Sequence, residues 1–160
     1  MTSESEDKLE LENPEAKSSM NNWFPKIRDC EEVTHPKTVK VEMNDDSKHH
    51  RKWYNEEDVV EAIEHLGTGY PVFVRTDMAS NKHRMKEASR IESEGDIRDT
   101  ILHLIEFNET ASLMGLPYES LYLREWVELE HHFKAFQETP IAKEVRFFIA
   151  DGEVLGGHFY

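Results

Sequence analysis

Seven residues near the middle of the chain, PVFVRTD (residues 71–77), predict the strand around which the rest of the fold is arranged. Its valine and phenylalanine residues do not alternate with polar ones, so we expect this strand to be covered on both faces. Arg75 is the only charged residue within the apolar run. A polar segment follows at once, so a sheet interior and a surface loop meet at this point.

An amphipathic helix is predicted on each side of this strand. Asn55 is a favoured N-cap, acidic residues fill the next turn, and Gly67 ends a run of apolar residues at helical spacing. The second helix begins near Ser93, with Asp96 three residues on, and ends at Gly115-Leu116-Pro117. Its apolar stripe consists of Ile97, Ile101, Leu104, Ile105 and Ala111.

Two further strands complete the predicted sheet. Residues 39–43 alternate apolar and charged side chains, and residues 120–127 carry Leu121 and Leu123 on one face. The polar segment at residues 43–52 is interpreted as a loop. Strands separated by helices indicate an α/β or an α+β arrangement of layers, and we expect the α+β class.

A hairpin is predicted at the end of the sequence. Residues 144–150 and 153–160 read as strands, and Asp151-Gly152 between them is the strongest short turn signal in the chain. A turn of two residues predicts two pairs of opposed residues, Arg146 with Gly157 and Phe148 with Leu155. Apolar side chains on both faces of this hairpin predict that it needs cover, so we expect self-association or a complementary partner fragment.

Composition limits the class of protein. The chain has 160 residues, 33 acidic and 19 basic, for a formal net charge of −14. Such a chain repels nucleic-acid phosphates and anionic lipid, so we expect neither nucleic acid nor membrane as a partner. No apolar block resembles a signal peptide or a membrane span, which predicts a cytoplasmic protein. A halophilic host would account for much of the acidity.

The first twenty residues, MTSESEDKLELENPEAKSSM, differ from the rest of the chain. They are rich in glutamate and serine and contain too little apolar surface to offset the entropy of ordering. We therefore expect residues 1–20 to form a disordered acidic leader.

Polar residues after the central strand suit a phosphate group. Arg75 offers a bidentate fork, and Ser80, Asn81 and Lys82 offer donors in the following loop. A solvated basic loop explains the same residues equally well. The segment lacks the glycine and lysine pattern of a P-loop.

A second group of polar residues follows the strand at 120–127. The strand breaks into an extended segment, whose backbone N–H and C=O groups can pair with an adenine edge, with the Trp126 indole as a wall. An ordinary edge strand with a core tryptophan is the alternative. Arg146, opposite a glycine, is either an anion ligand or a surface arginine. We assign no catalytic residue and no metal ligand, because no zinc or triad motif is present.

Four segments in order resemble the ATP-grasp superfamily, and are most similar to its prokaryotic and viral members. They are WFPKIRDCEEVTHPKTVKVEM (23–43), YPVFVRTDMASNKH (70–83), LYLREWVELE (121–130) and PIAKEVRFFIADGEVLGGHFY (140–160). The resemblance covers residues 22–160. It implies two α+β lobes that hold ATP between them, and an activity that joins a carboxylate to an amine or similar nucleophile through an acyl-phosphate.

The resemblance also implies roles for individual residues. Arg75 and Arg146 would bind phosphates, with the loop residues Ser80, Asn81 and Lys82 covering them. The hinge at residues 125–127 would pair with adenine, and Glu130 would bind the ribose.

The sequence departs from the family at its end. Family members continue beyond this hairpin with the carboxylates and asparagine that hold magnesium, so magnesium is expected only with such a C-terminal part. We therefore expect ATP binding, incomplete for catalysis, and keep a non-catalytic acidic interaction protein as the alternative. The expected organisation is a leader (1–20), an N-terminal segment (21–54), a first lobe (55–122), and a hinge with a partial second lobe (123–160).

Overall fold

The computed structural model describes residues 18–46, 51–81, 88–112, 118–134, 140–142, 144–150 and 153–159. Its helical elements are α2 (Met20–Arg28), α3 (Glu56–Leu66), the short 3₁₀ turn η2 (Glu94–Asp96) and α5 (Ile97–Ser112). Its strands are β1 (Thr38–Glu42), β2 (Asn44–Asp46), β3 (Arg51–Trp53), β4 (Val72–Thr76), β5 (Arg90–Ile91), β6 (Ser120–Glu125), β7 (His131–Lys134), β8 (Pro140–Ala142), β9 (Val145–Ala150) and β10 (Glu153–Phe159).

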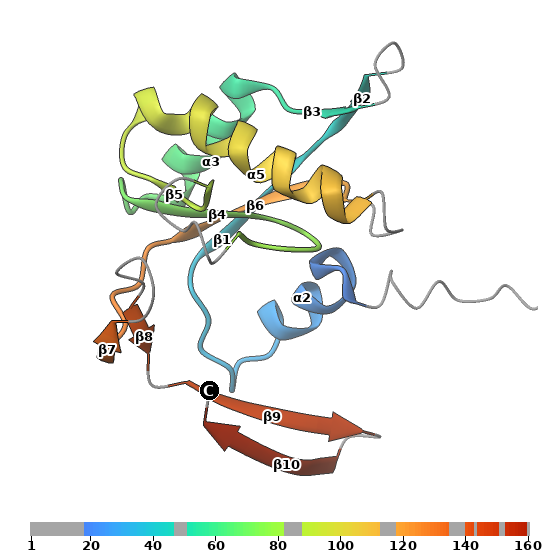
Figure 1. Cartoon of the computed structure of the whole chain (residues 1–160), viewed down its shortest axis with the longest axis vertical. Coiled ribbons are helices and arrows are strands. Elements are labelled where there is room, and N and C mark those ends of the chain that lie inside the picture. The colour runs from blue at the N-terminus through green and yellow to red at the C-terminus, as the bar shows by residue number, and fades with distance from the viewer. Residues whose placement is uncertain are drawn as a thin grey trace, which may run out of the picture.

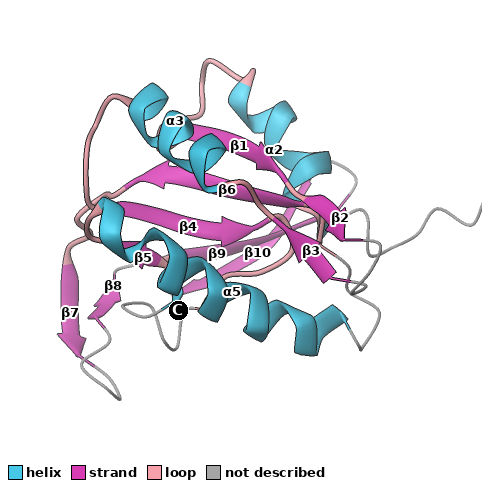
Figure 2. Cartoon of the chain, turned by 90° about the horizontal axis from the view of Figure 1, so that it is seen from above, coloured by secondary structure: helices cyan, strands magenta, loops and turns pink. Residues whose placement is uncertain are grey.

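A four-stranded antiparallel sheet forms the centre of the fold, in the order β1-β6-β4-β5. Helices α3 and α5 cover one face of this sheet, and α2 lies on the other side (Figure 1). Seen from above, the sheet strands run beneath the two helices (Figure 2). The α+β class predicted from the sequence is confirmed.

The main core lies between the sheet and the α3–α5 layer. Val72 and Val74 of β4 and Leu121 and Leu123 of β6 are fully buried there. The predicted apolar stripe of α5 is confirmed as far as its side chains are described, because four of its members are buried: Ile97, Ile101, Leu104 and Ile105.

Helix α3 begins and ends where its sequence predicts. The Asn55 side chain accepts a hydrogen bond from the backbone N–H of Glu57, which caps the first turn. Gly67 adopts a left-handed conformation with φ of 67°, and its N–H donates to the Glu64 carbonyl. Glycine is favoured at such a helix end because it has no Cβ to clash.

The start of α5 differs in detail from a capping box. The Ser93 hydroxyl donates to the Asp96 carboxylate at 2.7 Å instead of capping the backbone, and a 3₁₀ turn precedes the helix. The predicted stop at 115–117 lies outside the described residues.

The polar segment after β1 is not simply a loop. Strands β2 and β3 pair in antiparallel register, with Asn44 opposite Trp53. Polar composition misled the sequence prediction here, because a two-stranded ladder is held by backbone groups and does not need an apolar face.

The folded part of the chain begins before residue 21, inside the predicted leader. Ser19 caps α2, and the Met20 side chain is fully buried against Phe24 and Tyr122. Composition hid this contact, because a single methionine at the edge of a polar tract buries its surface only through packing on distant residues. Residues 1–17 lie outside the described part.

The C-terminal hairpin β9–β10 pairs in a register shifted from the predicted one. Glu153 lies opposite Ala150, as a two-residue turn requires, but an irregularity then places Gly156 opposite Phe148. Arg146 consequently faces His158. A β-bulge adds a residue to one strand of a pair, and the turn signal does not reveal it.

The hairpin lies on the α2 side of the molecule, apart from the central sheet (Figure 1). Six of its apolar side chains are exposed: Val145, Phe147, Phe148, Val154, Leu155 and Phe159. The short strands β7 and β8 form another separate pair. No helix in the described ranges is long and apolar enough to cross a membrane.

Candidate functional site: a cationic face of the central sheet

Three arginines project from the sheet face that lies opposite the α3–α5 layer. In the antiparallel ladder, Phe73 pairs with Arg90 on one side and with Arg124 on the other. Residues that pair directly share a face of the sheet, and so does Arg75, two residues after Phe73. The alternate residues of β4 and β6 are those buried under the helices. The sheet register therefore gathers these three cations on one surface, which we call the arginine face.

Arg75 and Arg124 are diagonal neighbours on this face, because Arg75 pairs with Tyr122. Burial and the repulsion of Arg124 lower the pKa of Arg75, while the charge of Asp77 partly offsets this. Burial also lowers the pKa of Arg124. Two cations held close in a partly dry position repel each other, and both favour an anion between them.

Neither guanidinium forms an ion pair within the described residues. The Arg75 Nε–H donates to the Thr76 carbonyl at 3.0 Å. The Arg124 Nε is buried without a hydrogen-bond partner in this part of the chain. A buried donor of this kind is unfavourable unless a partner binds there.

The Asp77 carboxylate is occupied by other donors. It accepts hydrogen bonds from the Ser19 hydroxyl at 2.7 Å and from the backbone N–H groups of Glu119 and Ser120 at 2.9 and 3.2 Å. The Asn21 amide lies at 3.4 Å. Asp77 thus joins α2, β4 and β6, and these contacts fix the end of β4 beside the arginine face.

Helix α2 covers one end of the arginine face. The Tyr122 hydroxyl donates to the Asn21 side chain at 2.8 Å, and its ring meets Phe24 edge-on at 5.9 Å. Burial, with the charges of Asp77 and Glu42, raises the pKa of Tyr122 to about 12. The phenol therefore stays neutral at physiological pH.

A stacked pair lies at the other end of the arginine face. The Arg90 guanidinium sits over the Trp126 ring, 4.4 Å from its centroid. The Trp126 indole N–H donates to the Glu128 carboxylate at 2.8 Å, and Arg90 Nε lies 3.1 Å from the Glu92 carboxylate. The indole is thus held by an interaction independent of the arginine.

The structure brings together only some of the predicted site residues. Arg75 lies on the arginine face and Trp126 at its rim. The loop residues Ser80 and Asn81 are half-buried and buried, and Lys82 lies outside the described residues.

Several other predicted residues do not join this group. The Glu125 N–H donates to the Lys37 carbonyl at 3.0 Å, so this donor is taken within the sheet. Val127 and Glu130 are exposed beyond the end of β6. Arg146 lies on the separate hairpin. Gly157 pairs with Phe147, and a Cβ added at Gly157 would lie 3.0 Å from the Phe147 ring.

Sequence reasoning missed Arg124 and Arg90. The signal for Arg124 was present, because it comes directly after Leu123, and successive residues of a strand point to opposite faces of the sheet. Arg90 belongs to a strand of two residues after a polar segment, where no periodicity exists.

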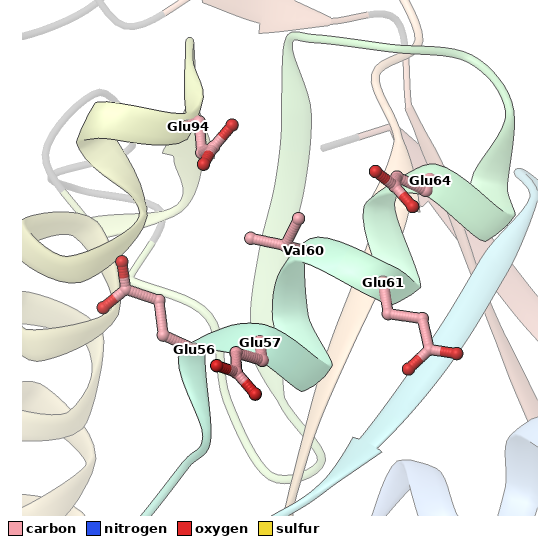
Figure 3. A pocket seen from close by; sticks show the side chains of 6 residues that line it. All are labelled: Glu56, Glu57, Val60, Glu61, Glu64 and Glu94. Atoms are coloured by element: carbon pink, nitrogen blue, oxygen red, sulfur yellow. The ribbon is translucent and has the colours of Figure 1, made fainter.

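A shallow hollow of about 560 Å³ lies elsewhere, beside α3 and η2 (Figure 3). Its lining side chains are five glutamates and one valine: Glu56, Glu57, Val60, Glu61, Glu64 and Glu94. Carboxylates repel phosphates, so this hollow does not suit a nucleotide. Within the described ranges, no group of three or more His, Cys, Asp or Glu residues is arranged to hold a metal ion.

Comparison with known proteins gives no relative. No protein-family model matches the chain, and no curated protein and no solved structure matches it either. The ATP-grasp resemblance therefore remains a prediction from the sequence motifs.

Proposed function

We propose that the chain binds an adenine nucleotide, with its phosphates on Arg75 and Arg124. The observation that carries this proposal is the placement of two partly buried guanidiniums side by side without a carboxylate between them in the described residues. A phosphate oxygen between the two would relieve their repulsion and satisfy the buried Arg124 donor. The two arginines support a phosphate ligand, and the ATP-grasp resemblance is the reason to propose ATP as the molecule that carries it.

The parent reaction of an ATP-grasp protein joins a carboxylate to an amine. The γ-phosphoryl group passes to the carboxylate, ADP leaves, and the amine then displaces phosphate from the acyl-phosphate. This chain would supply binding of the phosphates to that reaction. A cytoplasmic location, where ATP is abundant, is part of the proposal.

Calorimetric titration with ATP and ADP tests the binding. We expect weak binding to the wild-type chain and a loss of about ten- to a hundredfold in Arg75→Ala and in Arg124→Ala, because each charge-assisted contact contributes roughly 1.5–3 kcal/mol. Arg98→Ala is the matched control, since Arg98 is exposed on α5, on the opposite side of the sheet. A folded protein that binds no nucleotide at millimolar concentration would refute the proposal.

A second candidate function is a non-catalytic interaction protein. The observation that favours it is the hairpin β9–β10, whose apolar side chains are exposed on both faces and whose strands pair only with each other in the described part of the chain. Such a surface is typical of an association site. Light scattering over a dilution series tests this candidate, because an association site gives a mass that depends on concentration.

A further inference from the structure

The stack of Arg90 on Trp126 has the shape of a base-binding position. The Arg90 guanidinium carbon lies over the indole, 4.4 Å from the ring centroid. Its ion pair with Glu92 involves a side chain that is 56% exposed, so water screens it. A purine ring is flat and stacks on indole with greater contact area.

Accepting the proposed function, on which this step rests, we infer that Arg90 occupies the place of the nucleotide base on Trp126 and is displaced when the nucleotide binds. Arg90 then acts as a competitor that sets the affinity for the base. It is not a ligand of the base.

The geometry makes this exchange feasible without rearrangement of the sheet. The Trp126 indole keeps its bond to Glu128 at 2.8 Å when Arg90 leaves, so the stacking surface persists. The Arg90 side chain is 24% exposed and can swing toward solvent. Arg90 pairs with Phe73, and Phe73 pairs on its other side with Arg124. The stack therefore lies on the same face of the sheet as the arginines proposed to bind phosphate. A base on Trp126 and phosphates on Arg124 therefore share one surface.

The test compares three ligands that separate the base from the phosphates: ATP, adenosine and inorganic tripolyphosphate. Calorimetry measures their dissociation constants with the wild type, Arg90→Ala, Arg90→Leu and Trp126→Ala. The leucine variant retains an aliphatic cover over the strand, which guards against loss of folding in the alanine variant. Arg98→Ala again serves as the control.

We expect both Arg90 variants to bind adenosine about two- to fivefold more tightly, because a cation–π contact no longer has to be broken. Trp126→Ala is expected to weaken the affinity for ATP by about fivefold or more, which is the lower range for base stacking. Its affinity for tripolyphosphate should stay within about twofold of the wild-type value. Adenosine affinity that is unchanged or weaker in both Arg90 variants would overturn the inference. An equal loss of affinity for ATP and for tripolyphosphate in Trp126→Ala would also overturn it.

The two proposals fail in different ways. If the folded wild type binds no ATP, the proposed function is wrong and this inference falls with it. If ATP binds, and its affinity depends on Arg75 and Arg124 but not on Arg90 or Trp126, the proposed function stands and only the base-exchange inference is wrong.

Discussion

Replacement of Met20 by alanine tests whether the start of α2 is part of the folded core. The Met20 side chain is fully buried and packs with Phe24 and Tyr122, in a cluster separate from the main core. Truncation of a buried methionine to alanine costs about 2–5 kcal/mol. We expect about 2–3 kcal/mol, at the lower end of that range, because this small cluster lies near the surface and is able to close partly over the cavity.

Urea unfolding followed by circular dichroism measures this change, with the slope of the transition checked against the wild type. Lys26→Ala on the same helix is the control, since Lys26 is exposed, and its stability should stay within about 0.5 kcal/mol of the wild type. Composition alone predicts no effect at residue 20. A Met20→Ala variant as stable as Lys26→Ala would therefore show that α2 does not dock on Tyr122 as described.

Ionisation, backbone conformation and the exposed hairpin give three further tests. The pKa of Tyr122 is raised from 10.0 to about 12, so the unfolded chain loses this proton first; stability is complete below pH 10 and falls between pH 10 and pH 12. Tyr122→Phe should make that fall smaller in denaturant unfolding at stepped pH, because burial also raises the pKa values of Tyr54 and Tyr70; a fall as steep as that of the wild type would contradict the assignment. Gly67→Ala should cost about 1 kcal/mol in thermal unfolding, because φ is +67° while an added Cβ meets no atom within 4 Å; Gly95→Ala, which lacks a positive φ, is the control, and equal effects of the two would refute backbone strain as the cause. Phe147→Ser should lower the concentration-dependent mass seen by light scattering, because this ring is 61% exposed; a wild type that is monomeric at every dilution would exclude association through the hairpin.

The phosphate hypothesis was partly accessible from the sequence. Arg75 stands out because a charge within an apolar strand is unfavourable unless it finds a partner. The structure places Arg75 on a partly buried face. Its neighbour Arg124 did not stand out, because the two lie about fifty residues apart and meet only through the pairing of β4 with β6. Pairing register depends on contacts between distant segments, which periodicity within one segment does not reveal.

Local signals determined the bounds of α3 and the core-facing positions of β1 and β6. Asn55 and Gly67 bound α3, and the alternation of apolar residues at 39–43 and 121–123 assigns core-facing positions, because capping, backbone conformation and side-chain direction act over a few residues. The same locality explains the confirmed α+β class.

Tertiary structure alone decided which elements cooperate. Asp77 joins three segments through Ser19, Glu119 and Ser120, and Met20 is buried by Tyr122, more than a hundred residues away in sequence. The Arg90–Trp126 stack likewise joins β5 to the segment after β6. These contacts form because the sheet brings distant residues within a few ångströms, and the energy of a hydrogen bond or a stack depends on that distance and not on separation along the chain.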